Sequence, residues 1–419
     1  MSRPGRTAHA EEYTFRLRDS LLGAQMLCVA FGSLVLVPLL TGLDPNVALF
    51  TAGMGTLVFQ IVTRGRIPVF LASSFAFIAP IIYAVQTWGV PATLGGLIAT
   101  GVVYLLLAAL IAWRGVGLVQ RVLPPIVTGP VIMVIGLVLA PVAVNLATGH
   151  NSSGDETLVA SQPAMIVAGV SLVTTLAVSL LGRGFMSLLP IIFGVVAGYL
   201  ASLGFGLVDF TAVAEAPWLA MPNFTAPAFN WQAVLFMLPV AIAPAIEHFG
   251  DIIAIRSVTG RDYLTDPGIH RTMLGDGLAT SLAGMFGGPP NTTYSEVTGA
   301  VTLTGATNPA LMTWAAGFAI VFSFVGKLGA LLASIPTPVM GGIIVLLFGP
   351  IVVVGMNSLV QARDDLTESR NMAIVGLILI CGIGGLNFSL GQFTLQGIAL
   401  AGVLGVVLNL VLPRSRSDS

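Results

Sequence analysis

Charged residues are scarce in this sequence of 419 residues: only 8% are Asp, Glu, Lys or Arg, whereas a soluble domain carries about 25%. Hydrophobic residues make up 56% of the chain. A chain so poor in charge cannot maintain a soluble surface, so we predict a polytopic membrane protein embedded in the lipid bilayer. The 17 basic residues form no patch, which argues against a nucleic-acid partner.

Cysteine is nearly absent, and one nucleotide-binding motif is missing. Cys28 and Cys381 both fall in apolar runs, where a buried free thiol is expected in place of a disulfide. The phosphate-cradling motif, in which Gly-Lys and Ser or Thr follow a glycine after four residues, does not occur. ATP-driven pumping by this chain alone is therefore not expected.

Apolar runs of about 20 residues, the length that a membrane-crossing helix requires, recur along the whole chain. We predict fourteen spans from them. In the first half these are 20–41, 47–63, 67–86, 92–113, 124–146, 163–182 and 186–208. In the second half they are 232–255, 270–287, 291–305, 308–333, 338–361, 371–388 and 392–412.

The arginines alternate with these spans as the positive-inside rule describes. With a cytoplasmic N-terminus, sixteen of the 17 basic residues fall on the inner side, and only Lys327 falls near the outer end of a span. We therefore predict an integral protein of the cytoplasmic membrane with both termini in the cytoplasm. The inner residues are Arg3, Arg6, Arg16, Arg18, Arg64, Arg66, Arg114, Arg121, Arg183, Arg256, Arg261, Arg271, Arg363, Arg370, Arg414 and Arg416.

Two segments half a chain apart are similar to each other. PIVTGPVIMVIG begins at Pro125 and PVMGGIIVLLFG begins at Pro338, 213 residues later, and their first prolines and the glycines at the fifth and twelfth positions coincide. This offset pairs the fifth predicted span with the twelfth. Two repeats of seven spans must be inverted relative to each other, which is a common plan of secondary transporters. Chance similarity between apolar segments is the alternative.

Two apolar segments are poor helix material. IPVFLASSFAF (67–77) and GGPPNTTYSEVTG (287–299) each contain proline near the start, followed by hydroxyl, β-branched and aromatic residues that favour extended backbone. Extended backbone at membrane depth must find partners in protein, water or ligand. We therefore predict two facing extended stretches that leave N–H groups for a substrate, with ordinary proline-kinked helices as the alternative.

Four carboxylates fall in these apolar surroundings. Glu247 and Asp251 lie in AIEHFGD, Asp276 lies in LGDG, and Glu296 lies in the second of the two extended segments. A charged side chain at the bilayer centre costs about 2.5 to 3.5 kcal/mol even on insertion scales. Four of them in one region require a common reason, and a ligand or ion site is the default hypothesis.

The motifs EHFGD, GDG, GGPPNTTYSE and SSFAF, in the eighth, ninth, tenth and third spans, resemble the nucleobase/ascorbate transporter family, and within it the bacterial uracil permeases. The resemblance implies an all-α membrane protein with fourteen spans in two inverted seven-span repeats, and short antiparallel strands in spans 3 and 10. It implies a core domain (14–114 and 230–334) and a gate domain (115–208 and 335–413). It also implies a proton-coupled nucleobase symporter that forms a homodimer.

The resemblance also assigns substrate-binding residues. Glu247 and Glu296 match the family's base-binding glutamates, and Phe75 and Ser295 match the positions whose backbone N–H groups contact the base. Carboxylates can accept from the N–H groups of uracil while backbone amides donate to its carbonyls. Phe75 and Tyr294 are expected to pack against the ring. No catalytic residue is expected, so the chain is not predicted to be an enzyme.

Asp251, Asp276 and His248 are the candidates for proton coupling. Glu247 and Asp251 are four residues apart on one helical face, and His248 comes three residues before Asp251. Clustered carboxylates in apolar surroundings favour a bound proton, so we expect protons as the coupling ion and no cofactor. A structural hydrogen-bonding role is the alternative for each of the three.

Two positions depart from the uracil permeases. Where uracil permeases have His, this chain has Asp251, as purine-type members do. Val297 follows Glu296 at a position where Asn is common. Uracil is the expected substrate, and xanthine or urate is the alternative. An anion transporter of the same architecture would need basic residues or exposed helix N-termini at mid-depth. A metalloenzyme with Glu247, His248 and Asp251 as ligands would lack a second His, so no metal is expected.

Overall fold

A computed structural model describes residues 11–115, 117, 121–184, 186–362, 365–390 and 393–413. Five of the arginines in the orientation argument lie outside these ranges, namely Arg3, Arg6, Arg363, Arg414 and Arg416. Helices account for most of the described residues, and the strands among them are short.

The first half of the chain is mainly helical, with one short strand among its described residues. In order, the elements are the 3₁₀ turn η1 (Leu17–Asp19), α1 (Ser20–Val29), α2 (Phe31–Thr41), α3 (Pro45–Val62), β1 (Leu71–Ser73), η2 (Phe75–Phe77), α4 (Ile78–Arg114), α6 (Pro125–Val138), α7 (Ala140–Ala147), α8 (Ser161–Leu181) and η3 (Met186–Leu188). After these come α9 (Pro190–Gly204) and the short α10 (Thr211–Glu215) of the connection to the second half.

The second half repeats this plan. Its elements are α11 (Trp231–Met237), the 3₁₀ turn η4 (Leu238–Ala241), α12 (Ile242–Thr259), the π-helical turn η5 (Leu264–Gly268), α13 (Ile269–Phe286), β2 (Asn291–Thr293), α14 (Ser295–Thr304), α15 (Ala310–Ser323), α16 (Gly326–Ala333), α17 (Thr337–Ala362), α18 (Ser369–Ile383), β3 (Asn387–Leu390), β4 (Phe393–Gln396) and α19 (Gly397–Val411).

The helices have the length and surface of a membrane protein. Seven helical segments among the described residues are long and apolar enough to cross a bilayer. Large apolar side chains stay exposed on the outer helices, for example Leu180 of α8 at 71% and Ile380 of α18 at 73%, as expected for a lipid-facing surface. The predicted helical membrane fold is therefore confirmed. The count of fourteen spans stays a prediction, because several segments are short or interrupted.

The longest helix covers two predicted spans. α4 takes in the last part of the span 67–86, from Ile78 onward, and all of the span 92–113, but its backbone leaves the helical conformation at Gly89, where φ is 81°. This left-handed conformation suits glycine, and Pro91 follows two residues later. The break falls in the gap between the two predicted spans.

Short strands interrupt the third and tenth predicted spans, as the sequence led us to expect. β1 and β2 pair antiparallel, with Leu71 opposite Thr293, Ala72 opposite Thr292 and Ser73 opposite Asn291. All six residues are buried. The prolines that precede each strand cannot donate helical hydrogen bonds, and the two threonines of β2 favour extended backbone.

The boundaries of the last two predicted spans, 371–388 and 392–412, were wrong by about five residues. α18 already ends at Ile383, and β3 pairs antiparallel with β4 before α19 begins at Gly397. Gly385 and Gly397 both have positive φ, 71° and 52°, so the backbone turns at each end of this hairpin. Polar and apolar residues alternate in NFSL and FTLQ, a pattern typical of strands that the assignment of two helical spans overlooked.

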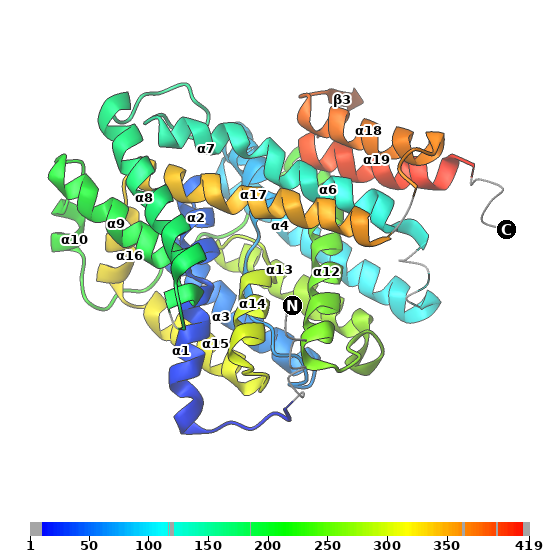
Figure 1. Cartoon of the computed structure of the whole chain (residues 1–419), viewed down its shortest axis with the longest axis horizontal. Helices are drawn as coiled ribbons and strands as arrows, with labels where there is room; N and C mark the ends of the chain where they lie inside the picture. The colour runs from blue at the N-terminus through cyan, green and yellow to red at the C-terminus, as the bar shows by residue number, and fades with distance from the viewer. Residues whose placement is uncertain are drawn as a thin grey trace.

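Corresponding elements of the two halves run in opposite directions. β1 is antiparallel to β2, and α6 lies against α17 so that Gly129 meets Gly355 while Gly136 meets Phe348. Figure 1 shows α6 (cyan) and α17 (orange) side by side above α12 and α14. Pro125 and Pro338 of the repeated motif stand at the starts of α6 and α17. The inverted relation predicted from the motif is confirmed for these pairs.

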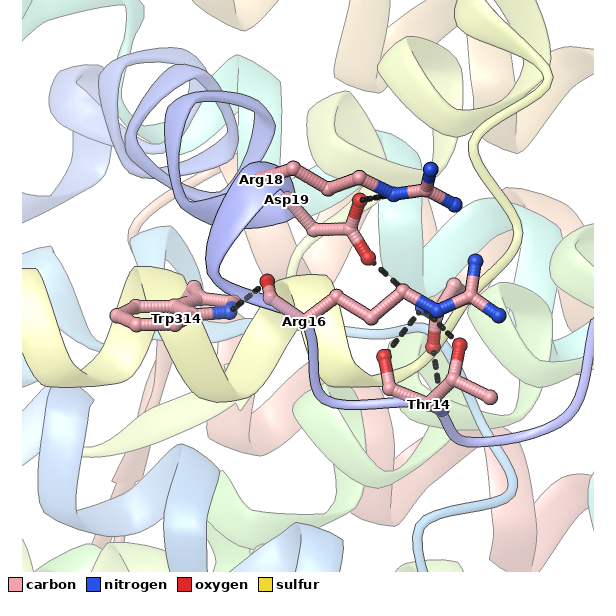
Figure 2. Close-up of polar contacts among 6 residues, drawn as sticks. Thr14, Arg16, Arg18, Asp19 and Trp314 are labelled. Atoms are coloured by element: carbon pink, nitrogen blue, oxygen red, sulfur yellow. Dashed lines mark hydrogen bonds and ion pairs between the residues drawn. The ribbon is translucent and has the colours of Figure 1, made fainter.

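The segment before the first helix is held against the start of α15 (Figure 2). The indole N–H of Trp314 donates to the carbonyl of Arg16 at 3.1 Å, and the ring of Trp314 stacks on Phe15 with centroids 4.5 Å apart. Asn308 donates to the carbonyl of Thr14 at 2.8 Å. Hydrogen bonds and ring stacking therefore hold residues 14–16 against residues 308–314 of the second half.

Candidate functional site

The paired strands form an extended element whose backbone is satisfied inside the protein. The N–H of Leu71 donates to Thr56 Oγ1 of α3 at 2.9 Å. On the other strand, the carbonyl of Asn291 accepts from Thr280 Oγ1 of α13 at 2.7 Å, and its side-chain amide donates to the carbonyl of Thr51 at 2.9 Å. Side chains of α3 and α13 thus supply the partners that the bilayer cannot.

Each strand leads directly into a helix. β1 continues through η2 into α4, and β2 continues through Tyr294 into α14. Because the strands are antiparallel, the two helices leave the strand pair in opposite directions and their N-termini meet there. The first N–H groups of a helix have no partner within it. The backbone N–H groups at Phe75 and Ser295 are therefore hydrogen-bond donors near the strand pair, and the positive ends of two helix dipoles lie behind them.

The four carboxylates predicted from the sequence converge beside these helix starts. Glu247 lies within electrostatic range of Asp251, Glu296 and Asp276. Its Oε2 atom is buried and has no hydrogen-bond partner among the described residues. A carboxylate oxygen in this condition has its accepting capacity free for a ligand.

Glu296 faces a cavity of about 180 Å³. The cavity lies between α14, the end of α1 and the segment that begins α9, and Cys28, Leu188 and Gly299 line it with Glu296. A second cavity of about 250 Å³ lies beside the first turn of α4, where Ala79 contributes to the lining together with residues of α6, α18 and α19. One cavity thus adjoins each of the two helix starts.

Three aromatic rings meet at the strand pair. The ring centroid of Phe75 lies 6.2 Å from that of Tyr294 and 6.3 Å from that of Phe348, and the second pair is edge-on. All three residues are buried. The sequence predicted Phe75 and Tyr294 as ring-packing residues but missed Phe348 of α17. The repeated motif gave no signal for it, because the equivalent position in the first half holds Ile135, which has no aromatic ring.

Asp251 ties α12 to the segment that joins β2 to α14. Its Oδ2 accepts from Thr293 Oγ1 at 2.7 Å, and its Oδ1 accepts from Ser295 Oγ at 2.6 Å. Both oxygens are therefore occupied by the hydroxyls that flank Tyr294. These contacts describe an anchor, the structural alternative considered from the sequence, while the proton-coupling role of Asp251 stays a prediction.

His248 and Asp276 form an enclosed pair, both with fully buried side chains. The Nε2 of His248 lies 2.9 Å from Thr272 Oγ1, whose own hydroxyl donates to the carbonyl of Ile269. We therefore assign Nε2 as the donor, which leaves Nδ1 as an acceptor. Nδ1 faces Asp276 Oδ2 at 3.6 Å. This distance is within ion-pair range but beyond a hydrogen bond. An acid and a base so close together and away from water influence each other's proton binding.

One residue near this pair was missed altogether. Tyr104 of α4 is fully buried, its hydroxyl has no hydrogen-bond partner in the described part of the chain, and it interacts electrostatically with Asp276 and Glu247. Nothing in the sequence marked it, because a single tyrosine in an apolar span has no motif around it. Among the described residues, no group of three His, Cys, Asp or Glu side chains is placed to hold a metal ion.

Comparison with known sequences gives near full-length matches. The profile of the Permease family matches residues 18–391. The "Probable uracil permease" of Haemophilus influenzae is 54% identical over 403 residues, which cover 96% of each chain. The "Uracil permease" of Bacillus subtilis is 42% identical over 402 residues, which cover 94% of this chain and 92% of that one.

Comparison with solved structures identifies the fold. The transmembrane domain of a cyanobacterial bicarbonate transporter, BicA, superposes with a TM-score of 0.66 at 16% identity, and the match covers 95% of this chain and 99% of that one. At this identity the likeness concerns the fold alone. The arrangement of helices described above is thus one that a known membrane transporter shares.

Proposed function

Because this chain belongs to the Permease family, we propose that it carries uracil across the cytoplasmic membrane together with protons. It is an integral membrane protein of a family of transporters, and its substrate is a small nucleobase. The observation that carries the choice of uracil is the similarity to proteins named uracil permease, with 54% identity over nearly the whole chain for one of them.

The site geometry supports this choice of substrate. Uracil has an edge of alternating N–H donors and carbonyl acceptors. Glu247 has an oxygen free to accept, and Glu296 lines an adjoining cavity. The helix starts at Phe75 and Ser295 offer N–H groups to the carbonyls. In this arrangement the base lies against Phe75 and Tyr294, and Phe348 contacts Phe75 from α17.

Alternating access requires two bodies that move past each other, and we assign residues 14–114 and 230–334 to a core and residues 115–208 and 335–413 to a gate. The packing of the helices supports this division. α13 packs on α3 and α4, and α15 packs on α1 and α3, whereas α17 packs on α6, α7 and α8. Each of the two cavities beside the helix starts has lining residues from both bodies, as a path between them requires.

The enclosed pair of His248 and Asp276 is the proposed proton-binding group. His248 and Asp276 share a proton at mid-depth, next to Glu247, so that proton binding and base binding influence each other. Asp251 transmits the change to the segment that joins β2 to α14 through its hydrogen bonds to Thr293 and Ser295. No cofactor takes part. Proton transfer to this group lowers the charge that the loaded core carries past the gate.

Cytoplasmic termini and a homodimer complete the proposal. The distribution of arginines supports the orientation. Lys327, the one basic residue predicted on the outer side, donates to the carbonyl of Val213 at 2.9 Å, which lies in the acidic connection between the two halves. The homodimer rests on the family resemblance.

The test is uptake of labelled uracil into proteoliposomes with and without an inward proton gradient. We expect saturable uptake that the gradient increases and that a protonophore reduces to the gradient-free rate. Uptake that is indifferent to the gradient would remove proton coupling and leave uracil transport standing.

A purine substrate is the second candidate, because Asp251 occupies a position where uracil permeases have His. Xanthine, hypoxanthine, urate and thymine as unlabelled competitors distinguish the two. Efficient competition by xanthine or urate, with no saturable uracil uptake, would establish a purine permease. An anion transporter, which the shared fold alone does not support, would show gradient-driven bicarbonate uptake instead.

A further inference from the structure

Tyr104 is a buried polar residue that the transport scheme above does not use. It is 0% exposed and is among the largest fully buried side chains of the described residues. Its hydroxyl has no hydrogen-bond partner within the described ranges. Buried hydroxyls are nearly always paired, and an unpaired one in a membrane interior has no compensating contact with water. The position of this hydroxyl therefore needs a functional reason.

The ring of Tyr104 lies where three helices meet. It packs with Ala241, at the end of η4, Ala245 of α12 and Met273 of α13. A methyl group at Gly277 of α13 would lie 2.8 Å from the Cβ of Tyr104, so α4 and α13 are in close contact here. Gly277 follows Asp276 directly, and this contact brings Tyr104 to the level of the enclosed acid.

The titratable groups around Asp276 come from several elements. Tyr104 approaches from α4, Glu247, His248 and Asp251 from α12, and Glu296 belongs to α14. α3 contributes the ring of Phe59, whose centroid lies 6.4 Å from that of His248. β2 contributes only a hydroxyl, since Thr292 Oγ1 lies 3.5 Å from Asp276 Oδ2. The described residues packed here therefore place no Lys or Arg against the acid.

Asp276 is thus short of donors. Its Oδ1 is buried without a partner among the described residues, and the contact from Thr292 to Oδ2 is at the limit of a hydrogen bond. His248 cannot supply a second donor while its Nε2–H points at Thr272. Tyr104 has the one remaining neutral hydroxyl that interacts electrostatically with Asp276.

We propose that Tyr104 is a positioning residue for proton coupling, whose hydroxyl donates through one water to the carboxylate of Asp276 and so sets the pH at which the His248–Asp276 pair takes up its proton. This inference rests on the proposed proton-coupled uptake. A donor stabilises the ionised carboxylate. Without it, the protonated form persists to higher pH, because nothing else holds the charge.

The test compares Tyr104→Phe with the wild type in uracil uptake across pH, and it measures KM and the maximal rate at each pH. Uptake by a proton symporter falls as the pH rises through the range in which the coupling group loses its proton. A hydrogen bond to a charged group corresponds to a shift of about one pH unit. We expect the midpoint of the decline to move up by about that amount in Tyr104→Phe, with KM at low pH unchanged.

Tyr263→Phe is the matched control. Tyr263 is 1% exposed and lies between α12 and α13, where it interacts with Thr259 and Arg261. Tyr263→Phe also removes a buried hydroxyl, and it should leave the pH midpoint of uptake unchanged. A purely structural role for Tyr104 would lower the thermal stability of Tyr104→Phe and leave the midpoint in place, and that result would overturn the inference.

The failure of the inference and that of the proposed function are distinguishable. If wild-type uptake does not depend on pH, proton coupling itself is wrong. If wild-type uptake depends on pH and Tyr104→Phe follows the same curve, only the role of Tyr104 is wrong. Should Tyr104→Phe fail to reach the membrane, 3-fluorotyrosine incorporated throughout the chain gives stronger phenol donors of nearly the same size. The midpoint should then move to lower pH, and an unchanged midpoint overturns the inference.

Discussion

The Oδ1 atom of Asp251 accepts a hydrogen bond of 2.6 Å from Ser295 Oγ, which joins the middle of α12 to the first residue of α14. A second bond of 2.7 Å from Thr293 to Oδ2 secures the other side of Tyr294. Tyr294, whose ring we propose to contact the base, is thus held from both sides by one carboxylate. A substitution at Asp251 should therefore alter the position of Tyr294 and so affect base binding, even though Asp251 itself does not contact the base.

Ser295→Ala should weaken this anchor. A hydrogen bond to a charged group is worth about 1.5 to 3 kcal/mol, so we expect a lower melting temperature and a higher KM for uracil. Ser257→Ala on the same helix as Asp251 is the control, because Ser257 donates only to the carbonyl of Ala254 in its own helix. Equal KM values for the two variants would show that the anchor does not shape the site.

Glu247→Gln should lose base binding. The amide keeps the size of the side chain but replaces one acceptor by a donor that faces the donor N–H of the base. Loss of one bond to a charged group corresponds to roughly 10- to 100-fold weaker affinity. Binding of labelled uracil to purified protein measures this. Glu215→Gln, on the exposed α10, should bind like the wild type, and full saturable binding by Glu247→Gln would take Glu247 out of the site.

Phe348→Leu tests the ring that only the structure revealed. An edge-on aromatic pair contributes about 0.5 to 1.5 kcal/mol beyond its buried area, so we expect KM to rise by roughly 2- to 10-fold while the protein remains folded. Phe205→Leu, at a position that is 46% exposed, should have no effect on KM. An unchanged KM in Phe348→Leu would mean that α17 contributes no ring to substrate binding.

Gly355→Ala should separate α6 from α17. The added methyl would lie 2.5 Å from the carbonyl oxygen of Gly129, and forced overpacking of this kind costs about 1 to 3 kcal/mol. Gly349→Ala, six residues earlier on the same helix, meets nothing within 4 Å. We expect the melting temperature to fall in the first variant alone. Equal melting temperatures would show that the two helices can move apart without loss.

Two side-chain hydrogen bonds among the described residues join the proposed core to the proposed gate, and movement of these two bodies past each other would break them. Gln86 donates to Ser153 Oγ at 2.8 Å, and the hydroxyls of Tyr199 and Ser334 lie 2.7 Å apart. Cysteines at Gln86 and Ser153, in a chain with Cys28 and Cys381 replaced by Ala, should permit a cross-link that stops uptake until it is reduced.

A pair within the core provides the control for this cross-link. Trp88 donates to Gln232 at 3.2 Å, and both residues belong to the proposed core. Cross-linked cysteines at these two positions should leave uptake intact. Transport through a cross-linked 86–153 pair would show that residues 14–114 and 115–208 do not move apart at that point.

Much of the architecture was readable from local features of the chain. Scarce charge and repeated apolar runs indicate a membrane protein, since each span depends on some 20 neighbouring residues. Proline with hydroxyl, β-branched and aromatic residues in 67–77 and 287–299 predicted the two interruptions, because these residue types disfavour helix. The hairpin of β3 and β4 escaped this reasoning, since the alternating pattern of NFSL and FTLQ is only four residues long in each strand.

The sequence by itself determined the membrane class, the broken spans and the four carboxylates, because each depends on residue type within a short stretch. It also indicated the inverted halves, because the motif at Pro125 recurs at Pro338. Only the tertiary structure decided that Asp251 is bound to Ser295, that Phe348 reaches Phe75, and that Tyr104 lies beside Asp276. These pairs are 44, 273 and 172 residues apart in the chain. Such contacts follow from how the helices pack against one another, which no local pattern specifies.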